Sequence, residues 1–509
     1  MLRTSIFVSA LTLMASALGF LNQVLLAKIF GASSQMDSYL LGISVPTTLA
    51  GILAGVLSYQ LVPSLQKALV KRGSTDEIIC SLCVGLGGGG LLVAVLGSAT
   101  AGTLLRLVCG TGGPAAPLGE IGFARIAWFW IPLGVLTAIY TSLLHTKGRF
   151  IAAACGQSFP ILGTLLGCVW GAGHFGPQAL VLGQSIGYCM HLILLLWLSG
   201  RIRIGFDWNM LGQLLKRLPL AYVALLIFVI YPFSDSFLGS RVGPSAVSYL
   251  GYVQRLVVGI ASLTVTGVST VIFPTMAKLA AEGNEEQVMS NLKGILRGII
   301  IVVSPLVATL VVFSPEAVYL IFERGAFTRL NTIELAGLLP YMLVGIVAAC
   351  CMIVVFRVLF ASGRVWLAAG CSFGGVCCYI GSSLGLVGSF GLKGIGMGYM
   401  LSWWGLLIVS LLKLKLFKGM NLRRLIEFPF KVGGGLCLLL AVDIIGACFI
   451  KWYAAGVDFS AYVFPAMVVG CVGGVVYAIV LFSLDVREIV YLKDRITCIW
   501  FTCAKTKLN

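Results

Sequence analysis

A small set of polar side chains lies inside long apolar runs of this chain. The set combines two arginines, one aspartate and four neutral hydrogen-bonding residues. Lipid offers such groups no hydrogen bonds, so we expect them to face a protein interior or a wet cavity. The chemistry open to them there is hydrogen bonding and charge pairing. The candidate binding residues are Ser16, Asn22, Gln23, Asp37, Gln60, Arg255 and Arg357.

These ionisable residues also have structural alternatives. Asp37 lies at the outer start of its apolar run, where it is equally suited to cap a helix amino terminus. Arg255 lies well inside its run, which favours cavity lining, but a structural ion pair with a carboxylate such as Asp235 competes with that interpretation. Arg357 is nearer the cytoplasmic end and can snorkel toward the headgroups. Asp443 has no obvious cationic partner, so a protonated or packing role competes with an ion site.

The sequence contains no recognisable constellation of catalytic residues. It has no nucleophile elbow, no H-E-x-x-H and no phosphate loop. The three histidines, His145, His174 and His191, are expected in loops or at a span edge. Most of the 16 cysteines lie in apolar runs, where cysteine behaves as a small hydrophobe. We therefore predict a protein that is not an enzyme, with no catalytic residue, no cofactor, no metal site and no disulfide framework.

The composition is that of a membrane protein. Of 509 residues, 59% are hydrophobic and only 10% are charged, whereas a soluble protein carries about 25% charged residues. The first apolar run has no cleavage-type motif, so we expect a retained helix and not a signal peptide. Runs of roughly 20 apolar residues predict fourteen spans, at 5–27, 38–60, 79–105, 121–144, 150–171, 178–199, 218–238, 246–273, 295–314, 333–361, 366–387, 394–412, 432–450 and 460–484.

The distribution of basic residues predicts the orientation of these spans. With both termini in the cytoplasm, 25 of the 35 Lys and Arg residues fall on the cytoplasmic side and 8 on the other side. The net charge of +17 is therefore explained by topology. Nucleic acid is not expected as a partner, and attraction to anionic membrane lipids is a secondary consequence.

Short sequence echoes predict an internal repeat. Three pairs of segments recur in the same order at offsets of 210–215 residues. An even number of spans separates the partners, so the halves share one orientation and are related by a pseudo-two-fold axis along the membrane normal. We predict an all-α polytopic protein with two six-helix lobes, 1–200 and 201–420, and two extra helices with a basic tail at 421–509. The paired segments are Ser38–Leu40 with Ser248–Leu250, Pro63–Lys67 with Pro274–Lys278, and Gly148–Arg149 with Gly363–Arg364.

Three motifs resemble those of a known membrane-protein family. From Leu18 the chain reads LGFxxxxxxAxxFGAxxxxDSY, then P-x-x-L and SYQLVP-x-L. The eighth span carries Tyr252 and Arg255 followed by IFPTMAK, and LIFERGAFTRLNT occupies Leu320–Thr332. Together they resemble the MurJ/MviN lipid II flippases of the multidrug/oligosaccharidyl-lipid/polysaccharide exporter superfamily.

The resemblance implies a function and a location. It implies a multi-pass flippase of the bacterial inner membrane that moves a polyprenyl-pyrophosphate-linked saccharide outward by alternating access, with lipid II as the first-choice substrate. Family members bind the pyrophosphate with cavity arginines, whose fixed charge suits that role, and their two extra helices form a groove for the lipid tail. We expect a monomer and a coupling ion that no residue identifies.

The sequence departs from the family pattern at the cavity. Of the usual set Asp37 and Arg255 remain, and Arg357 occupies a basic position on the tenth helix. Loss of cationic partners would weaken pyrophosphate binding. The chain then either carries lipid II with fewer charges or carries another lipid-linked polysaccharide unit. Family charges are replaced at Ser16, Asn22, Gln23, Ala50, Gly51 and Gly55.

Other classes of function stay open. A cation-coupled small-molecule exporter of the same superfamily would need an acidic cation site, and few intramembrane carboxylates are present. A transport-inactive membrane scaffold is suggested by the lost arginines. An integral-membrane transferase is disfavoured, because no carboxylates or histidines cluster in the loops.

Overall fold

The computed structural model describes residues 2–72, 75–109, 118–200, 205–262, 284–414, 422–453 and 460–484. These parts are almost entirely helical and contain no strand. Twelve of their helices are long and apolar enough to cross a membrane, which confirms the prediction of an all-α polytopic membrane protein. The count of fourteen stays a prediction. Two further predicted spans coincide with helical segments, one inside Trp208–Val242 and one beginning with the helix at 246–262.

The described residues form two compact units, which do not follow the chain order. The first unit comprises 1–263, 322–335 and 364–402, and the second comprises 264–321, 336–363 and 403–509. The helices α15 (Arg329–Ala361) and α17 (Leu392–Lys413) contribute to both. The predicted lobe boundaries stay a prediction.

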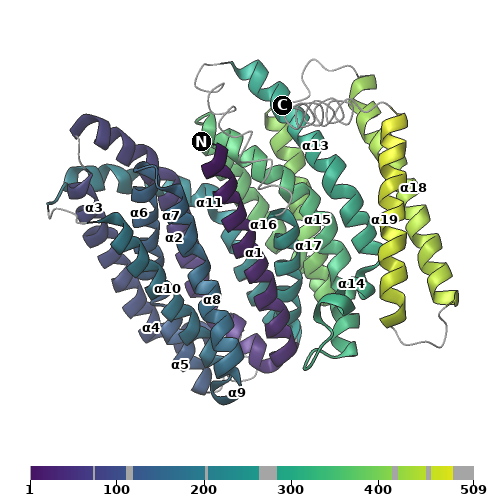
Figure 1. The fold of residues 1–509 in the computed structure, drawn as a ribbon, viewed down its shortest axis with the longest axis horizontal. Coiled ribbons are helices and arrows are strands. Elements are labelled where there is room, and N and C mark those ends of the chain that lie inside the picture. The colour runs from purple at the N-terminus through teal and green to yellow at the C-terminus, as the bar shows by residue number, and fades with distance from the viewer. Residues whose placement is uncertain are drawn as a thin grey trace, which may run out of the picture. The chain divides into compact units, whose positions relative to one another are not determined.

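In the first unit, α2 packs along α6 and α11, α10 packs along α8 and α6, and α16 packs along α11 (Figure 1). Large apolar side chains such as Trp130, Leu57 and Leu61 are fully buried between these helices. The elements are α1 (Leu2–Phe30), α2 (Ser34–Arg72), α3 (Asp76–Leu82), η1 (Cys83–Gly87), α4 (Gly88–Cys109), α5 (Leu118–Ala127), α6 (Trp130–Thr146), α7 (Phe150–Cys155), η2 (Gly156–Ser158), α8 (Phe159–Leu166), η3 (Gly167–Gly171), α9 (Ala172–Phe175), α10 (Gln178–Ser199), α11 (Trp208–Val242), the helix at 246–262 and α16 (Val365–Phe390).

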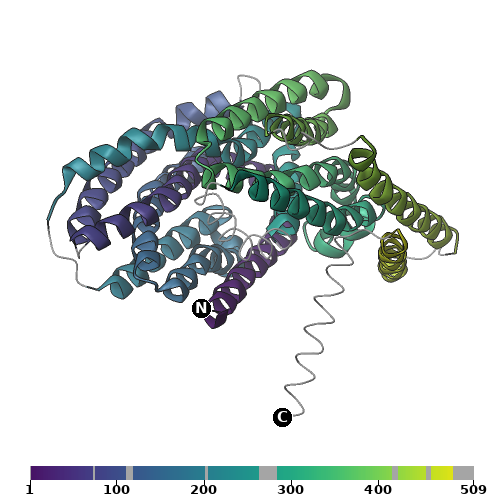
Figure 2. The same ribbon diagram turned by 90° about the horizontal axis from the view of Figure 1, so that it is seen from above.

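In the second unit, α18 and α19 lie side by side and pack against α13 (Figures 1 and 2). The bounds are α13 (Glu285–Val312), α14 (Ser314–Phe322), α18 (Leu422–Tyr453) and α19 (Ser460–Ser483). Asp443 is buried in this packing, and its Oδ2 accepts a hydrogen bond from the Thr309 hydroxyl at 2.8 Å. Gly473 leaves the room that the carboxyl group occupies, because a Cβ there would lie 2.6 Å from Asp443 Oδ1.

The predicted span 150–171 lies in one helical run, Phe150–Phe175, whose pitch changes at two places. The helix tightens at η2, a single 3₁₀ turn, and widens at η3, a π-helical turn. Pro160, in the first turn of α8, explains the first change, because it has no N–H to donate to the carbonyl four residues before it. Gln157 lies in the 3₁₀ turn.

Glycines bring α8 and α10 into backbone contact. A Cβ added at Gly163 would overlap the Gly183 carbonyl, and the reverse holds equally. Gly187 lies as closely against the backbone of Phe159. This is the small-residue packing that membrane helices use when no hydrophobic effect drives them together. It places Thr164 beside Gln184, with 3.5 Å between the hydroxyl and Oε1.

We expect Gly183→Ala to destabilise the protein by about 2 kcal/mol, because the new methyl group forces two backbones apart. Gly370→Ala, on α16, is the matched control, since a Cβ there meets nothing within 4 Å; it is expected to be neutral or slightly stabilising. Free energies of unfolding in mixed micelles measure both. Equal values for the two variants would show that the α8–α10 contact adapts without cost.

Several segments meet in a hydrogen-bonded junction where α1 ends. We call this group of residues the signature junction; it comprises Lys28–Ser33, Asp37, Ser245–Tyr252 and Gly325–Ala326. Gly31 ends α1 with a φ of +59°, as is common after a helix. Carbonyls at the end of α1 and just after it accept hydrogen bonds from other segments. The Lys28 carbonyl accepts from the Ala326 N–H (2.8 Å), the Gly31 carbonyl from the Tyr252 hydroxyl (2.8 Å) and the Ala32 carbonyl from the Ser245 hydroxyl (2.9 Å).

Asp37 completes this junction. Its Oδ1 accepts a hydrogen bond from the Ser248 N–H at 2.7 Å and a further short one from the Ser248 hydroxyl. It therefore caps the first turn of the helix at 246–262, which carries Arg255. Asp37 therefore caps a helix, as the alternative interpretation proposed, but the helix that it caps is the one at 246–262 and not α2, on which it lies.

Candidate functional site

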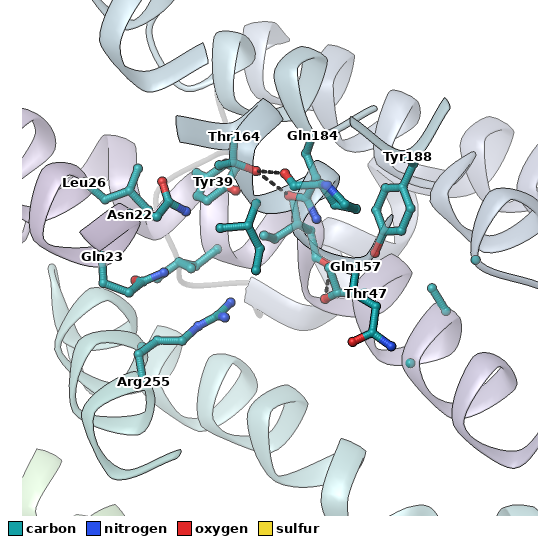
Figure 3. A pocket seen from close by; sticks show the side chains of 18 of the residues that line it. Asn22, Gln23, Leu26, Tyr39, Thr47, Gln157, Thr164, Gln184, Tyr188 and Arg255 are labelled. Atoms are coloured by element: carbon teal, nitrogen blue, oxygen red, sulfur yellow. Dashed lines mark hydrogen bonds between the residues drawn. The ribbon is translucent and has the colours of Figure 1, made fainter. Parts of the chain in front are cut away.

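A polar cavity of about 390 Å³ lies within the first unit. It is lined by α1, α2, α6, η2, α8, α10 and the helix at 246–262 (Figure 3). Arg255 is the one lining residue with a fixed charge among the described residues. The other polar lining residues are Asn22, Gln23, Tyr39, Thr47, Thr137, Gln157, Thr164, Gln184, Tyr188, His191 and Tyr252.

Arg255 extends into this cavity with its guanidinium group available (Figure 3). The side chain is exposed and forms no hydrogen bond or ion pair with another residue in the described ranges. The alternative of an ion pair with Asp235 is wrong: the carboxylate of Asp235 is buried and accepts a hydrogen bond from the Tyr379 hydroxyl. A guanidinium in a cavity can bind an anionic oxygen pair through two parallel hydrogen bonds.

Asn22 and Gln23, on α1, line the same cavity and lie on the same side of it as Arg255 (Figure 3). Both side chains are buried, and Asn22 Oδ1 has no hydrogen-bond partner in the described structure. The structure therefore brings together three of the seven predicted residues, which come from two separate segments of the chain. Their role in binding stays a prediction.

The other four predicted residues do not line this cavity. Ser16 is half-buried on α1 and lies outside the lining, and Asp37 caps the helix at 246–262. Arg357 is half-buried on α15 in the second unit. Gln60 lies on α2, but its side chain is outside the described residues. Binding roles for these four residues remain predictions, because none of the four is among the residues that line the cavity.

Sequence reasoning missed most of the opposite side of the cavity. Gln184, Tyr188 and His191 recur at helical spacing on α10, and this polar stripe inside an apolar run was the available signal. The expectation that His191 lies in a loop or at a span edge is wrong, because it lies inside α10 with 6% of its surface exposed. Gln157, a polar side chain inside the apolar run 150–171, was also missed.

A second hollow, of about 560 Å³, lies in the second unit. Its lining is mostly apolar and comes from α13, α15, α17 and α18. Two basic residues of α13, Lys293 and Arg297, belong to it, and the Arg297 guanidinium lies over the Phe428 ring at 4.9 Å. An apolar groove with cationic residues suits an amphipathic lipid.

The sequence model of the family described as Lipid II flippase MurJ matches residues 26–465. The chain belongs to this MurJ family. It is 24% identical over 361 residues to the "Probable lipid II flippase MurJ" of Buchnera aphidicola subsp. Acyrthosiphon pisum, covering 68% of this chain and 71% of that relative. It is 23% identical over 385 residues to the Vibrio cholerae protein of the same description, with coverages of 68% and 72%.

Solved structures agree with the fold of this MurJ-family chain. One described as "Lipid II flippase MurJ, inward closed conformation" has a TM-score of 0.78 at 18% identity and covers 94% of this chain and 99% of its own. An inward-facing multidrug resistance MATE family transporter has a TM-score of 0.66 at 14% identity, with coverages of 82% and 100%. The MurJ family consists of transporters and not enzymes, and its members are multi-pass proteins of the bacterial inner membrane.

Proposed function

We propose that this chain is a flippase that moves lipid II, a polyprenyl-pyrophosphate-linked saccharide, from the cytoplasmic to the outer leaflet by alternating access. The observation that carries the proposal is the unpaired guanidinium of Arg255 in a polar cavity of a MurJ-family chain. A polar cavity of this kind shelters a head group that cannot cross hydrocarbon by itself. The relatives named above, described as lipid II flippases, support the choice of substrate.

The apolar hollow of the second unit is the proposed binding groove for the polyprenyl tail. Its lining of valine, leucine and isoleucine side chains matches the chemistry of an isoprenoid. Each buried methylene contributes about 0.8 kcal/mol, so even a partly inserted tail adds substantially to affinity. Lys293 and Arg297 provide favourable charge for a phosphate-bearing lipid at this groove.

The remaining features of the proposal concern topology and partners. Both termini are placed in the cytoplasm by the basic residues, which also attract anionic lipids. Two six-helix lobes, 1–200 and 201–420, move against each other, and 421–509 supplies the added helices. The protein acts as a monomer, coupled to an ion that no residue identifies, and has no nucleic-acid partner.

Reconstitution in liposomes tests this function. Fluorescent lipid II is placed in the vesicles, and a membrane-impermeant reagent reports how fast inner-leaflet label reaches the outer leaflet. We expect the protein to accelerate this movement at least about tenfold over protein-free vesicles, because a sheltered head group avoids most of the desolvation cost. The proposal fails if the rate is unchanged and the protein also does not rescue bacteria depleted of their own lipid II flippase.

A further inference from the structure

The cavity has two walls of different chemistry. One side carries Arg255, Asn22 and Gln23. Across from Arg255 lie Gln184 and Tyr188 (Figure 3). We call the second side the neutral wall; it consists of Gln157, Thr164, Gln184, Tyr188 and His191, which supply hydrogen-bond donors and acceptors but no fixed charge.

The observation that points most directly to a ligand at the neutral wall concerns His191. Its side chain is 94% buried, since 6% is exposed, yet its Nε2 has no hydrogen-bond partner in the described structure. The ring is held in place by Gly156, where an added Cβ would overlap Cδ2 and lie 2.5 Å from Nε2. Buried polar atoms are normally paired, and His191 also lines the cavity, which makes a ligand group there the candidate for the missing partner.

The neutral wall is also held rigid by its surroundings. The Trp130 indole N–H donates a hydrogen bond to the Ser185 hydroxyl at 2.8 Å, and the Trp130 ring lies 6.2 Å from the Tyr188 ring. These contacts fix the rotation of α10, while the Gly163–Gly183 contact fixes α8 against it. A binding site preorganised in this way loses little entropy when a ligand enters.

The chemistry of the wall selects the ligand group. Amides, hydroxyls and an imidazole match hydroxyl and acetamido groups, which are neutral and both donate and accept hydrogen bonds. A phosphate is disfavoured there, because the wall offers it no cation. A fully apolar molecule would leave the buried His191 Nε2 atom without a partner.

We propose that the neutral wall is the saccharide subsite of the cavity: it binds hydroxyl and acetamido groups of the sugar head group, while Arg255 binds the pyrophosphate. This inference rests on the proposed function. It explains how a cavity with one fixed positive charge holds its substrate, since hydrogen bonds to the sugar replace part of the affinity that further arginines would give. Sites built around substrate hydroxyls also discriminate strongly against ligands that lack them.

Binding of two ligands to the full chain in lipid nanodiscs tests the assignment. One ligand is lipid II, and the other is the polyprenyl pyrophosphate without sugar. Gln184→Met, His191→Leu and Thr164→Val each remove hydrogen-bonding groups from the neutral wall, and Thr100→Val on α4 is the control for a hydroxyl outside the cavity. We expect each wall variant to weaken lipid II binding by about tenfold and to leave polyprenyl pyrophosphate binding within about twofold of wild type.

Retained binding of the sugar-free ligand also shows that a variant is folded. The assignment is overturned if all three wall variants bind lipid II like wild type, or if all three lose both ligands to the same extent. Either result leaves the proposed function standing, provided that the wild-type protein flips lipid II in vesicles. A wild-type protein that moves no lipid II would instead remove the proposed function itself.

Discussion

Arg255→Ala is expected to reduce the rate of lipid II translocation by roughly ten- to a hundredfold. Hydrogen bonds to a charged group contribute about 1.5–3 kcal/mol each, and this guanidinium is the one fixed charge that lines the cavity in the described structure. Its loss leaves the pyrophosphate with neutral donors only. The vesicle assay measures the rate, and the affinity for polyprenyl pyrophosphate is expected to fall in parallel.

The conservative variant separates charge from geometry. Arg255→Lys keeps the positive charge but loses the planar fork that holds two oxygens at once, so an intermediate rate is expected. Arg241→Ala is the matched control: Arg241 lies in the last turn of α11, is exposed, and lies over the Phe237 ring outside the cavity. A rate for Arg255→Ala equal to that of Arg241→Ala would contradict a charge-dependent cavity.

The sequence predicted one half of the cavity and missed the other for a physical reason. Asn22, Gln23 and Arg255 stand out because each is costly in an apolar run, whatever the fold. Gln184 and His191 are equally costly, but they become a site only through the contact of α8 with α10, which depends on pairs of glycines distant in the chain. Periodicity within α10 indicates a polar face without saying what that face meets.

The existence of the helices was more predictable than the local pitch within them. Twelve helices match apolar runs because the membrane requires about 20 apolar residues per span wherever they lie. The change of helical pitch at η2 depends on a single proline, Pro160, in a segment that is apolar on both sides of it. The sequence predicted that Asp37 could cap a helix, but not which helix. A cap is normally local in sequence, whereas here the capping residue and the capped residue are 211 residues apart.

Asp37→Ala is expected to cost about 3 kcal/mol of unfolding free energy. The variant leaves the buried Ser248 N–H without its acceptor and leaves the Ser248 hydroxyl only the Ser33 carbonyl at 3.5 Å. Each buried unpaired donor costs about 1–3 kcal/mol. It also removes a negative charge from the first turn of the helix at 246–262, where the helix dipole favours one. Denaturant unfolding in mixed micelles measures the loss.

Two control variants identify the cause of this loss. Glu286→Ala removes an exposed carboxylate from the first turn of α13 and is expected to cost less than about 1 kcal/mol. Asp37→Asn keeps an acceptor oxygen, so it is expected to be milder than alanine. Equal losses for Asp37→Ala and Glu286→Ala would show that the junction does not depend on this carboxylate.

The coupling between Asp37 and Ser248 is a stricter test of the same junction. Both residues act through shared hydrogen bonds, so Ser248→Ala added to Asp37→Ala is expected to cost much less than the sum of the single losses. If the two losses simply add, Asp37 does not stabilise the protein through its hydrogen bonds with Ser248. Because the capped helix carries Arg255, Asp37→Ala is also expected to slow lipid II translocation, even in protein that remains folded. The hydrogen bonds of Asp37 at the signature junction therefore both stabilise the fold and position Arg255. Arg255 is the one fixed charge in the cavity lining that the structure describes.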